Sequence, residues 1–169
     1  MKKIILRQSL IFGLLAGFSC FLFFLTMYNL KSNPLNFRRA DLGINIILIW
    51  AAIWYFKRNR GGYLHFYEAF SIGFLTNLFA AIFSGILVYA FIEFYDKTPF
   101  DVWIFEGKAL MLKEKETFSR ILNDETFRKQ IISFDNLKTY QIITDELMFK
   151  QIAIVPISLI SMAMRKLNM

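Results

Sequence analysis

Residues 69–94, AFSIGFLTNLFAAIFSGILVYAFIEF, decide the fold of this chain. The stretch carries no charged residue before Glu93, and it is longer than the roughly 20 residues with which a helix crosses the hydrocarbon core of a bilayer. We therefore predict that it forms a transmembrane helix with enough length to tilt.

Three further apolar segments lie at about 9–30, 42–56 and 147–164. The first begins after a basic N-terminus, but its apolar run continues past Cys20, so it indicates a retained helix rather than a signal peptide. The second covers only about 22 Å at 1.5 Å per residue, so we expect Arg39, Asp41 and Lys57 to reach the interfaces or the bilayer to thin. For the fourth, Thr144 and Asp145 are the predicted cap.

The fourth segment is interrupted by Pro156. Proline removes one helical hydrogen bond and frees the carbonyl of Ile152, so a kink is expected there. Ser158 or Ser161 could re-satisfy the backbone nearby. We favour a role in helix shape over the broken-helix binding sites of transporters.

Composition agrees with a membrane location. Apolar residues make up 56 % of the chain and aromatic residues 18 %, above the usual share of soluble domains. The net charge of +7 comes from cations beside the apolar runs, which is typical of membrane proteins and argues against nucleic-acid binding. A lone cysteine, Cys20, excludes an intramolecular disulfide.

The stretch between the third and fourth segments, about 98–143, is polar but periodic. Apolar residues from Phe100 to Leu122, with Phe118 and Ile121 among them, fall largely on one helical face. Asn123 can cap a second helix with the face Phe127, Ile131 and Phe134. We predict an all-α membrane protein, a single domain over 1–169 with four transmembrane helices and an amphipathic helical loop between the third and fourth.

The distribution of Lys and Arg predicts that both termini are cytoplasmic. The cations assigned to the inner side are Lys2, Lys3, Arg7, Lys57, Arg58, Arg60, Arg165 and Lys166. The short outer loop holds Lys31, Arg38 and Arg39.

Small residues mark helix-packing faces in the first and third segments. Gly73, Asn77, Ala81 and Gly85 follow one another at four-residue spacing, and Asn77 could hydrogen-bond across a helix contact. The Gly13-x-x-x-Gly17 pair of the first segment could be the partner of this stripe. We favour packing inside the bundle over an oligomer interface.

Two acids, Glu68 and Glu93, lie at the ends of the third segment and are functional candidates because charge in or beside a membrane span is costly. The alternative for Glu68 is a favourable helix-terminus carboxylate beside basic residues, and Glu93 could simply reach the outer interface. His65-x-x-Glu68 has metal-binding spacing, but two ligands do not make a site. We find no catalytic constellation, expect no cofactor or metal, and predict that the chain is not an enzyme.

The segment Gly61-Gly62 followed by Phe66-x-Glu68-Ala69-Phe70-x-x-Gly73, together with Pro156, resembles a bacterial family of small four-helix membrane proteins known only as a domain of unknown function. The resemblance implies this fold and an inner-membrane location, and it carries no activity. Because members often occur beside genes for glycosyltransferases, it also suggests a glycosyltransferase system as a partner. The paired glycines themselves predict a tight turn between the second and third spans.

Two functions remain open. The first is a non-enzymatic inner-membrane protein, a structural or accessory subunit of a membrane assembly, with membrane lipids and a homo-oligomeric or other membrane-protein partner. The alternative is a small oligomeric transporter or lipid-handling protein with Glu68, Asn77, Glu93 and the Pro156 kink along its path.

Overall fold

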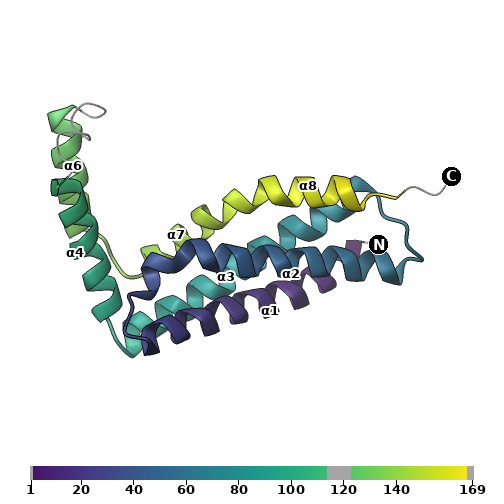
Figure 1. Ribbon diagram of the computed structural model, residues 1–169, viewed down its shortest axis with the longest axis horizontal. Coiled ribbons are helices and arrows are strands. Elements are labelled where there is room, and N and C mark those ends of the chain that lie inside the picture. Colours follow the sequence, from purple (N-terminus) through teal and green to yellow (C-terminus); the bar gives the residue numbers. More distant parts are fainter. Residues whose placement is uncertain (1, 114–122, 167–169) are drawn as a thin grey trace.

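The structure of this chain is a computed structural model that describes residues 2–113 and 123–166. Three long helices and the α7–α8 segment run side by side, and α4 and α6 form a hairpin across one end (Figure 1). The helices are α1 (Lys2–Asn29), η1 (Pro34–Phe37), α2 (Arg38–Asn59), α3 (Phe66–Phe94), α4 (Thr98–Lys113), α6 (Asp124–Asp135), α7 (Gln141–Lys150), η2 (Gln151–Ala153) and α8 (Ile154–Met164). Four stretches are long and apolar enough to cross a membrane, so the chain is a multi-pass, all-α membrane protein.

Two of the spans extend beyond the apolar runs that predict them. The second covers Ala40–Asn59, which is 20 residues or about 30 Å of helix, so its length needs no thinned bilayer. Asp41 therefore lies inside the span, and its carboxylate points to Lys150 instead of the interface. The fourth span begins at Gln141, so the predicted cap at Thr144 and Asp145 is wrong: both residues lie within α7.

The contact between α1 and α3 is the most extensive in the bundle. A Cβ atom added to Gly13 would lie 2.5 Å from the Cβ of Phe79, and one added to Gly17 would lie 3.0 Å from the carbonyl oxygen of Ala80. Only glycine permits this approach of the two helices. The small pair of the first segment therefore packs inside the bundle.

The turn between α2 and α3 is built by the predicted glycine pair. Gly61 and Gly62 have φ values of 66° and 90°, in the region that favours glycine. Glu68 then holds the start of α3, because its carboxylate accepts a hydrogen bond from the backbone N–H of His65 at 3.1 Å and pairs with Arg60. Glu68 thus has the helix-terminus role that its position suggests.

The interior has two apolar clusters, one toward each end of the bundle. The cluster near the termini contains Ile49, Ala52, Ile53, Phe56, Leu64, Ala69, Ile72, Ala153 and Ile157. The cluster near the hairpin contains Phe24, Leu35, Val88, Ile92, Phe100 and Ile142. Six buried polar residues of α2, α3 and α7 fall between the two clusters, namely Asn45, Thr76, Asn77, Ser84, Glu146 and Lys150, whereas Glu68 and Ser161 lie at the terminal end of the bundle. The core is therefore apolar, polar and apolar again along its length.

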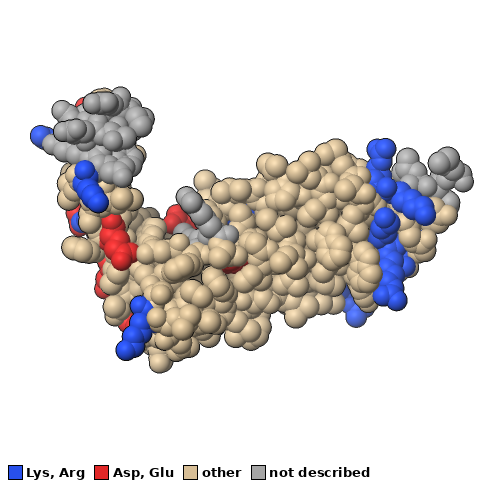
Figure 2. Space-filling model, in the orientation of Figure 1, with Lys and Arg blue, Asp and Glu red and all other residues tan. Residues whose placement is uncertain are grey.

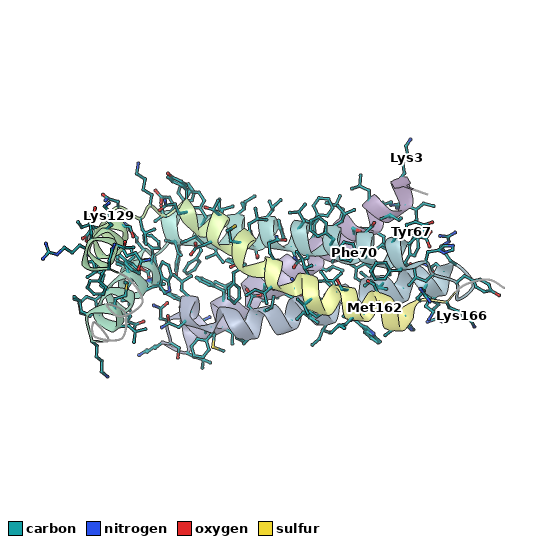
Figure 3. The ribbon with its side chains drawn as sticks, turned by 90° about the horizontal axis from the view of Figure 1, so that it is seen from above. Lys3, Tyr67, Phe70, Lys129, Met162 and Lys166 are labelled. Atoms are coloured by element: carbon teal, nitrogen blue, oxygen red, sulfur yellow. The ribbon has the colours of Figure 1, made fainter. Side chains whose placement is uncertain are left out.

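On the surface, charged side chains gather at the two ends of the molecule (Figure 2). Figure 2 shows basic side chains gathered at the end that holds both termini, a largely uncharged band along the bundle, and mixed charges on the hairpin. Lys3 and Lys166 lie at one end and Lys129 at the other (Figure 3). The band has the form expected for a surface in contact with lipid.

The hairpin is attached firmly to the bundle. Phe100 of α4 is buried in the nearby apolar cluster, and Asn36 donates to Glu106 at 2.8 Å. The face of α6 that the periodicity predicts packs on α4, with Phe127 buried and the ring of Phe134 beside Gly107. Asn123 caps α6 by accepting from Thr126 N–H at 2.8 Å. The predicted face residues Phe118, Ile121 and Leu122 lie outside the described residues.

Candidate functional site

Lys150 is the centre of the buried polar layer between the two apolar clusters. Its side chain is 1 % exposed, and its Nζ lies 2.5 Å from Oε1 of Glu146, one turn earlier on α7. The ammonium also donates to Oγ of Ser84 on α3 at 2.8 Å and lies 3.4 Å from Oδ2 of Asp41 on α2. One cation thus joins three helices, where an unpaired charge would be very costly.

A chain of amides extends the layer toward the termini. Asn45 on α2 donates to the side-chain oxygen of Asn77 on α3 at 2.6 Å. Asn77 in turn donates to the backbone carbonyl of Lys150 at 3.0 Å. These bonds tie α2, α3 and α7 together at the depth of the ammonium.

The carbonyl of Lys150 is available to Asn77 because the fourth span is not a regular helix. The N–H of Ile154 bonds to Gln151, three residues back, in the 3₁₀ turn η2. That turn lies just before Pro156, which cannot donate to Ile152. The two serines do not reach Ile152: Ser158 donates to Ile154 and Ser161 to Ile157. The kink at Pro156 stays a prediction, but the span departs from a regular helix at η2 just before it, and Asn77 satisfies the Lys150 carbonyl that this turn leaves open.

A small cavity of about 20 Å³ lies beside the carboxylates of Asp41 and Glu146, with Ser84 in its wall. This volume is enough for one water molecule. Oδ1 of Asp41 is buried there without a hydrogen-bond partner among the described residues. Such an arrangement can bind a proton or water, and it has no room for an organic substrate.

The stripe of the third segment lies on a different face of α3 from the one that meets Gly13 and Gly17. Gly73 faces Ile157 on α8 and two isoleucines of α2, and Gly85 faces Ile143 on α7. Ala81 and Asn77 are buried between them. The Gly13–Gly17 pair meets α3 at Phe79, Ala80 and Phe83, beside the stripe, so it is not the partner of Gly73 and Gly85 themselves. The stripe lets α7–α8 approach α3 and places Asn77 under the Lys150 carbonyl.

The two acids singled out at the ends of α3 do not meet. Glu68 and Glu93 are separated by 25 residues of helix, or about 38 Å. Glu93 is exposed at the hairpin end and accepts from the hydroxyl of Thr139. Asn77 lies between them, and its side chain bonds to Asn45 and to the carbonyl of Lys150 in the polar layer. Among the described residues, no group of three or more metal-ligating side chains forms a metal site.

The sequence interpretation missed the charged part of the layer. Asp41 and Glu146 lie just outside the predicted spans 42–56 and 147–164, Asp41 is predicted to reach the interface, and the pattern assigns no role to Glu146 or Lys150. The spacing of Glu146 and Lys150, four residues apart at the start of an apolar run, was the available indication of a buried pair.

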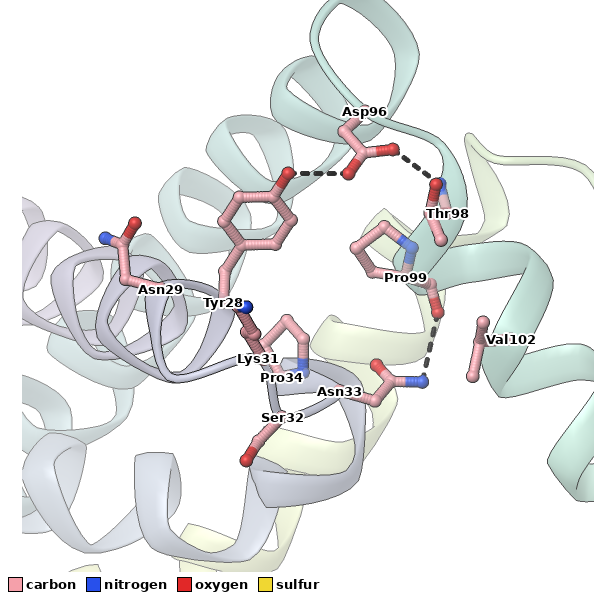
Figure 4. Close-up of a pocket in the computed structure, with 10 residues that line it drawn as sticks. All are labelled: Tyr28, Asn29, Lys31, Ser32, Asn33, Pro34, Asp96, Thr98, Pro99 and Val102. Carbon is pink, nitrogen blue, oxygen red and sulfur yellow. Dashed lines mark hydrogen bonds between the residues drawn. The ribbon is translucent and has the colours of Figure 1, made fainter.

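A larger pocket of about 460 Å³ opens at the hairpin end (Figure 4). It lies where α1 ends and α4 begins, and two hydrogen bonds across it join these elements. The hydroxyl of Tyr28 donates to Asp96 at 2.6 Å, and Asn33 donates to the carbonyl of Pro99 at 3.2 Å. The lining residues are Tyr28, Asn29, Lys31, Ser32, Asn33, Pro34, Asp96, Thr98, Pro99 and Val102.

Asp96 is the electrostatic centre of this joint. Its second carboxylate oxygen accepts from the N–H of Thr98 at 2.9 Å. Hydrogen bonds from Thr98 and Tyr28 hold the pKa of Asp96 below its ordinary value, because they stabilise the charged form. The carboxylate therefore fixes the start of α4 against the end of α1.

Comparison with known proteins identifies the family and nothing more specific. The model of the family described as "Protein of unknown function (DUF4199)" matches residues 11–166, and the chain belongs to this family. No curated protein and no solved structure matches the chain. The family is the uncharacterised one that the resemblance suggests, and any activity has to be argued from the molecule itself.

Proposed function

We propose that this member of a family of unknown function is a non-enzymatic accessory subunit of an assembly in the bacterial inner membrane, and that the α4–α6 hairpin is its docking element. The observation that carries the proposal is the hairpin itself. It lies across the end of the bundle and extends beyond it (Figure 1). Phe105, Leu110, Leu112 and Ile132 on its two helices are between 56 % and 73 % exposed. Large exposed apolar residues on a fixed element are typical of interaction sites.

The attachment of the hairpin supports docking, because side-chain contacts fix its position on the bundle. Asp96, Asn36 and Phe100 attach α4 to the bundle, and Lys108 pairs with Asp135 to hold α6 on α4. A partner that binds a pre-ordered surface loses less conformational entropy. The absence of room for an organic substrate beside the buried charges also favours a role without chemistry.

Co-purification from the native membrane tests the proposal. Phe105→Ser and Ile132→Ser should remove a crosslinked partner, while Leu30→Ser, an equally exposed apolar residue outside the hairpin, should retain it. A membrane-bound glycosyltransferase system is the first partner to examine. Recovery of isolated monomers only, together with no growth phenotype on deletion of Phe100–Tyr140, would contradict the proposal.

The alternative function is a small oligomeric transporter or lipid-handling protein, and the buried polar layer favours it. Ionisable groups at this depth in transporters mark ion pathways. Four helices leave only a thin path, so this function requires several copies. In proteoliposomes, Asp41→Asn and Glu146→Gln should slow the decay of a pH gradient, whereas Glu68→Gln and Glu93→Gln should not. Equal decay in empty vesicles, wild type and all variants would exclude proton-coupled transport.

A further inference from the structure

The pocket at the joint of α1 and α4 combines both signs of charge with apolar walls (Figure 4). Lys31 lies on one side and Asp96 on another, with Asn29, Ser32 and Asn33 as further polar groups. Pro34, Pro99 and Val102 supply apolar surface. A ligand that fits this lining has an anionic group for Lys31, a cationic group that can donate a hydrogen bond to Asp96, and a short linker between the two groups.

Lys31 lies in the turn that ends α1. Its φ of 56° is that of the left-handed residue of this turn, in which the N–H of Ser32 bonds to the carbonyl of Met27 at 3.2 Å and the N–H of Lys31 bonds to that of Tyr28 at 3.0 Å. Its side chain is exposed, and among the described residues no carboxylate forms an ion pair with it. The ammonium is therefore available to an anion from outside the chain.

The depth of the pocket points to the source of the ligand. The first span ends at Asn29 and the third at Phe94, so the pocket lies where the hydrocarbon core gives way to headgroups. Tyr28 and Tyr95 pack edge to face beside it, as aromatic residues do at this boundary. Leu30 and Phe94 next to it are 65 % and 83 % exposed and can lie against acyl chains.

We propose that this pocket binds the headgroup of a zwitterionic phospholipid that carries a primary ammonium, as in phosphatidylethanolamine. The lipid phosphate lies at Lys31, and the lipid ammonium donates to Asp96. Both oxygens of Asp96 already accept one hydrogen bond each, but a carboxylate has about four acceptor sites, so a further donor can be accommodated. A simple anion would be repelled by Asp96, which favours the zwitterion. The site stands apart from the proposed docking role and does not depend on it.

Native mass spectrometry of the delipidated protein tests this site. Phosphatidylethanolamine should bind more tightly than phosphatidylglycerol, and inorganic phosphate should not compete. Lys31→Gly should weaken phosphatidylethanolamine binding about tenfold, the loss expected for one charge-assisted hydrogen bond. Glycine suits the left-handed backbone at position 31, so this variant removes the charge without straining the turn.

Two further variants make the result decisive. Lys97→Ala removes an exposed cation that pairs with Asp101 outside the pocket, and it should leave binding unchanged. Val102→Trp should fill the pocket and abolish binding, while Val155→Trp, at an exposed position on α8, should not. Equal binding by wild type, Lys31→Gly and Val102→Trp would overturn the proposal. Equal binding of phosphatidylglycerol, or displacement of lipid by inorganic phosphate, would do so as well.

Discussion

At the scale of single residues, Asp96 connects pH to the joint between α1 and α4. Its pKa is lowered in the folded protein by hydrogen bonds from Thr98 and Tyr28, so the ionised form stabilises the fold. This contribution is complete above the unfolded pKa of about 3.9 and is lost as the pH falls through the lower folded value. The joint should therefore loosen in acid.

Thermal unfolding in detergent at a series of pH values measures this effect. Asp96→Asn should lower the unfolding temperature at neutral pH, since the amide cannot accept both hydrogen bonds as a carboxylate does. The difference from wild type should shrink as the pH falls through the folded pKa of Asp96, which lies below the ordinary value of about 3.9, because the wild-type carboxylate is then also protonated. A difference that stays constant even at pH values where wild-type Asp96 is protonated would show that Asp96 does not stabilise the joint through its charge.

Lys150 is the residue on which the buried layer depends. Lys150→Met keeps the apolar stem but removes the ammonium that contacts Glu146, Ser84 and Asp41. Removing one member of a buried ionic group costs about 3–5 kcal/mol, so unfolding in mixed micelles should occur far more readily. The triple variant Lys150→Met, Glu146→Gln, Asp41→Asn should recover most of the loss. Equal destabilisation of the single and triple variants would mean that the loss of stability comes from altered packing and not from unpaired charge.

At the scale of helices, the α1–α3 contact depends on glycine at two positions. Gly13→Ala places a methyl group 2.5 Å from Phe79 Cβ, so the helices must separate. Such overpacking costs about 1–3 kcal/mol. Gly43→Ala is the matched control, because it lies within α2 and a Cβ there meets nothing within 4 Å. It should be neutral or stabilise by up to about 1 kcal/mol through helix propensity. Equal unfolding free energies for the two variants would contradict the role of the close contact.

The helices also show what the sequence could and could not predict. Apolar length predicted the four spans, and paired glycines predicted the Gly61–Gly62 turn, because both depend on local composition. The partner of the Gly73–Gly85 stripe could not be predicted, since small residues indicate close approach but not which helix approaches. The charged layer was missed for a related reason. A charge near the end of an apolar run, such as Asp41 or Glu146, looks the same whether it faces water or a distant lysine.

At the scale of the whole molecule, the four spans place both termini at one end, and the basic side chains gather at that end (Figure 2). By the rule that cytoplasmic ends are rich in Lys and Arg, we expect this end to face the cytoplasm and the hairpin to face outward. The expectation also bears on the lipid site, which would then contact the outer leaflet.

Labelling of single cysteines in intact cells checks the orientation. Cys20 is the only cysteine and is buried, so Cys20→Ala gives a clean background. In that background, Lys129→Cys on the hairpin should react with a membrane-impermeant maleimide, and Asn59→Cys at the other end should react only after the membrane is permeabilised. Both side chains are exposed, so a difference in labelling should report on which side of the membrane each residue lies. The reverse pattern would place the hairpin in the cytoplasm, and partners for its apolar surface would then have to be sought there.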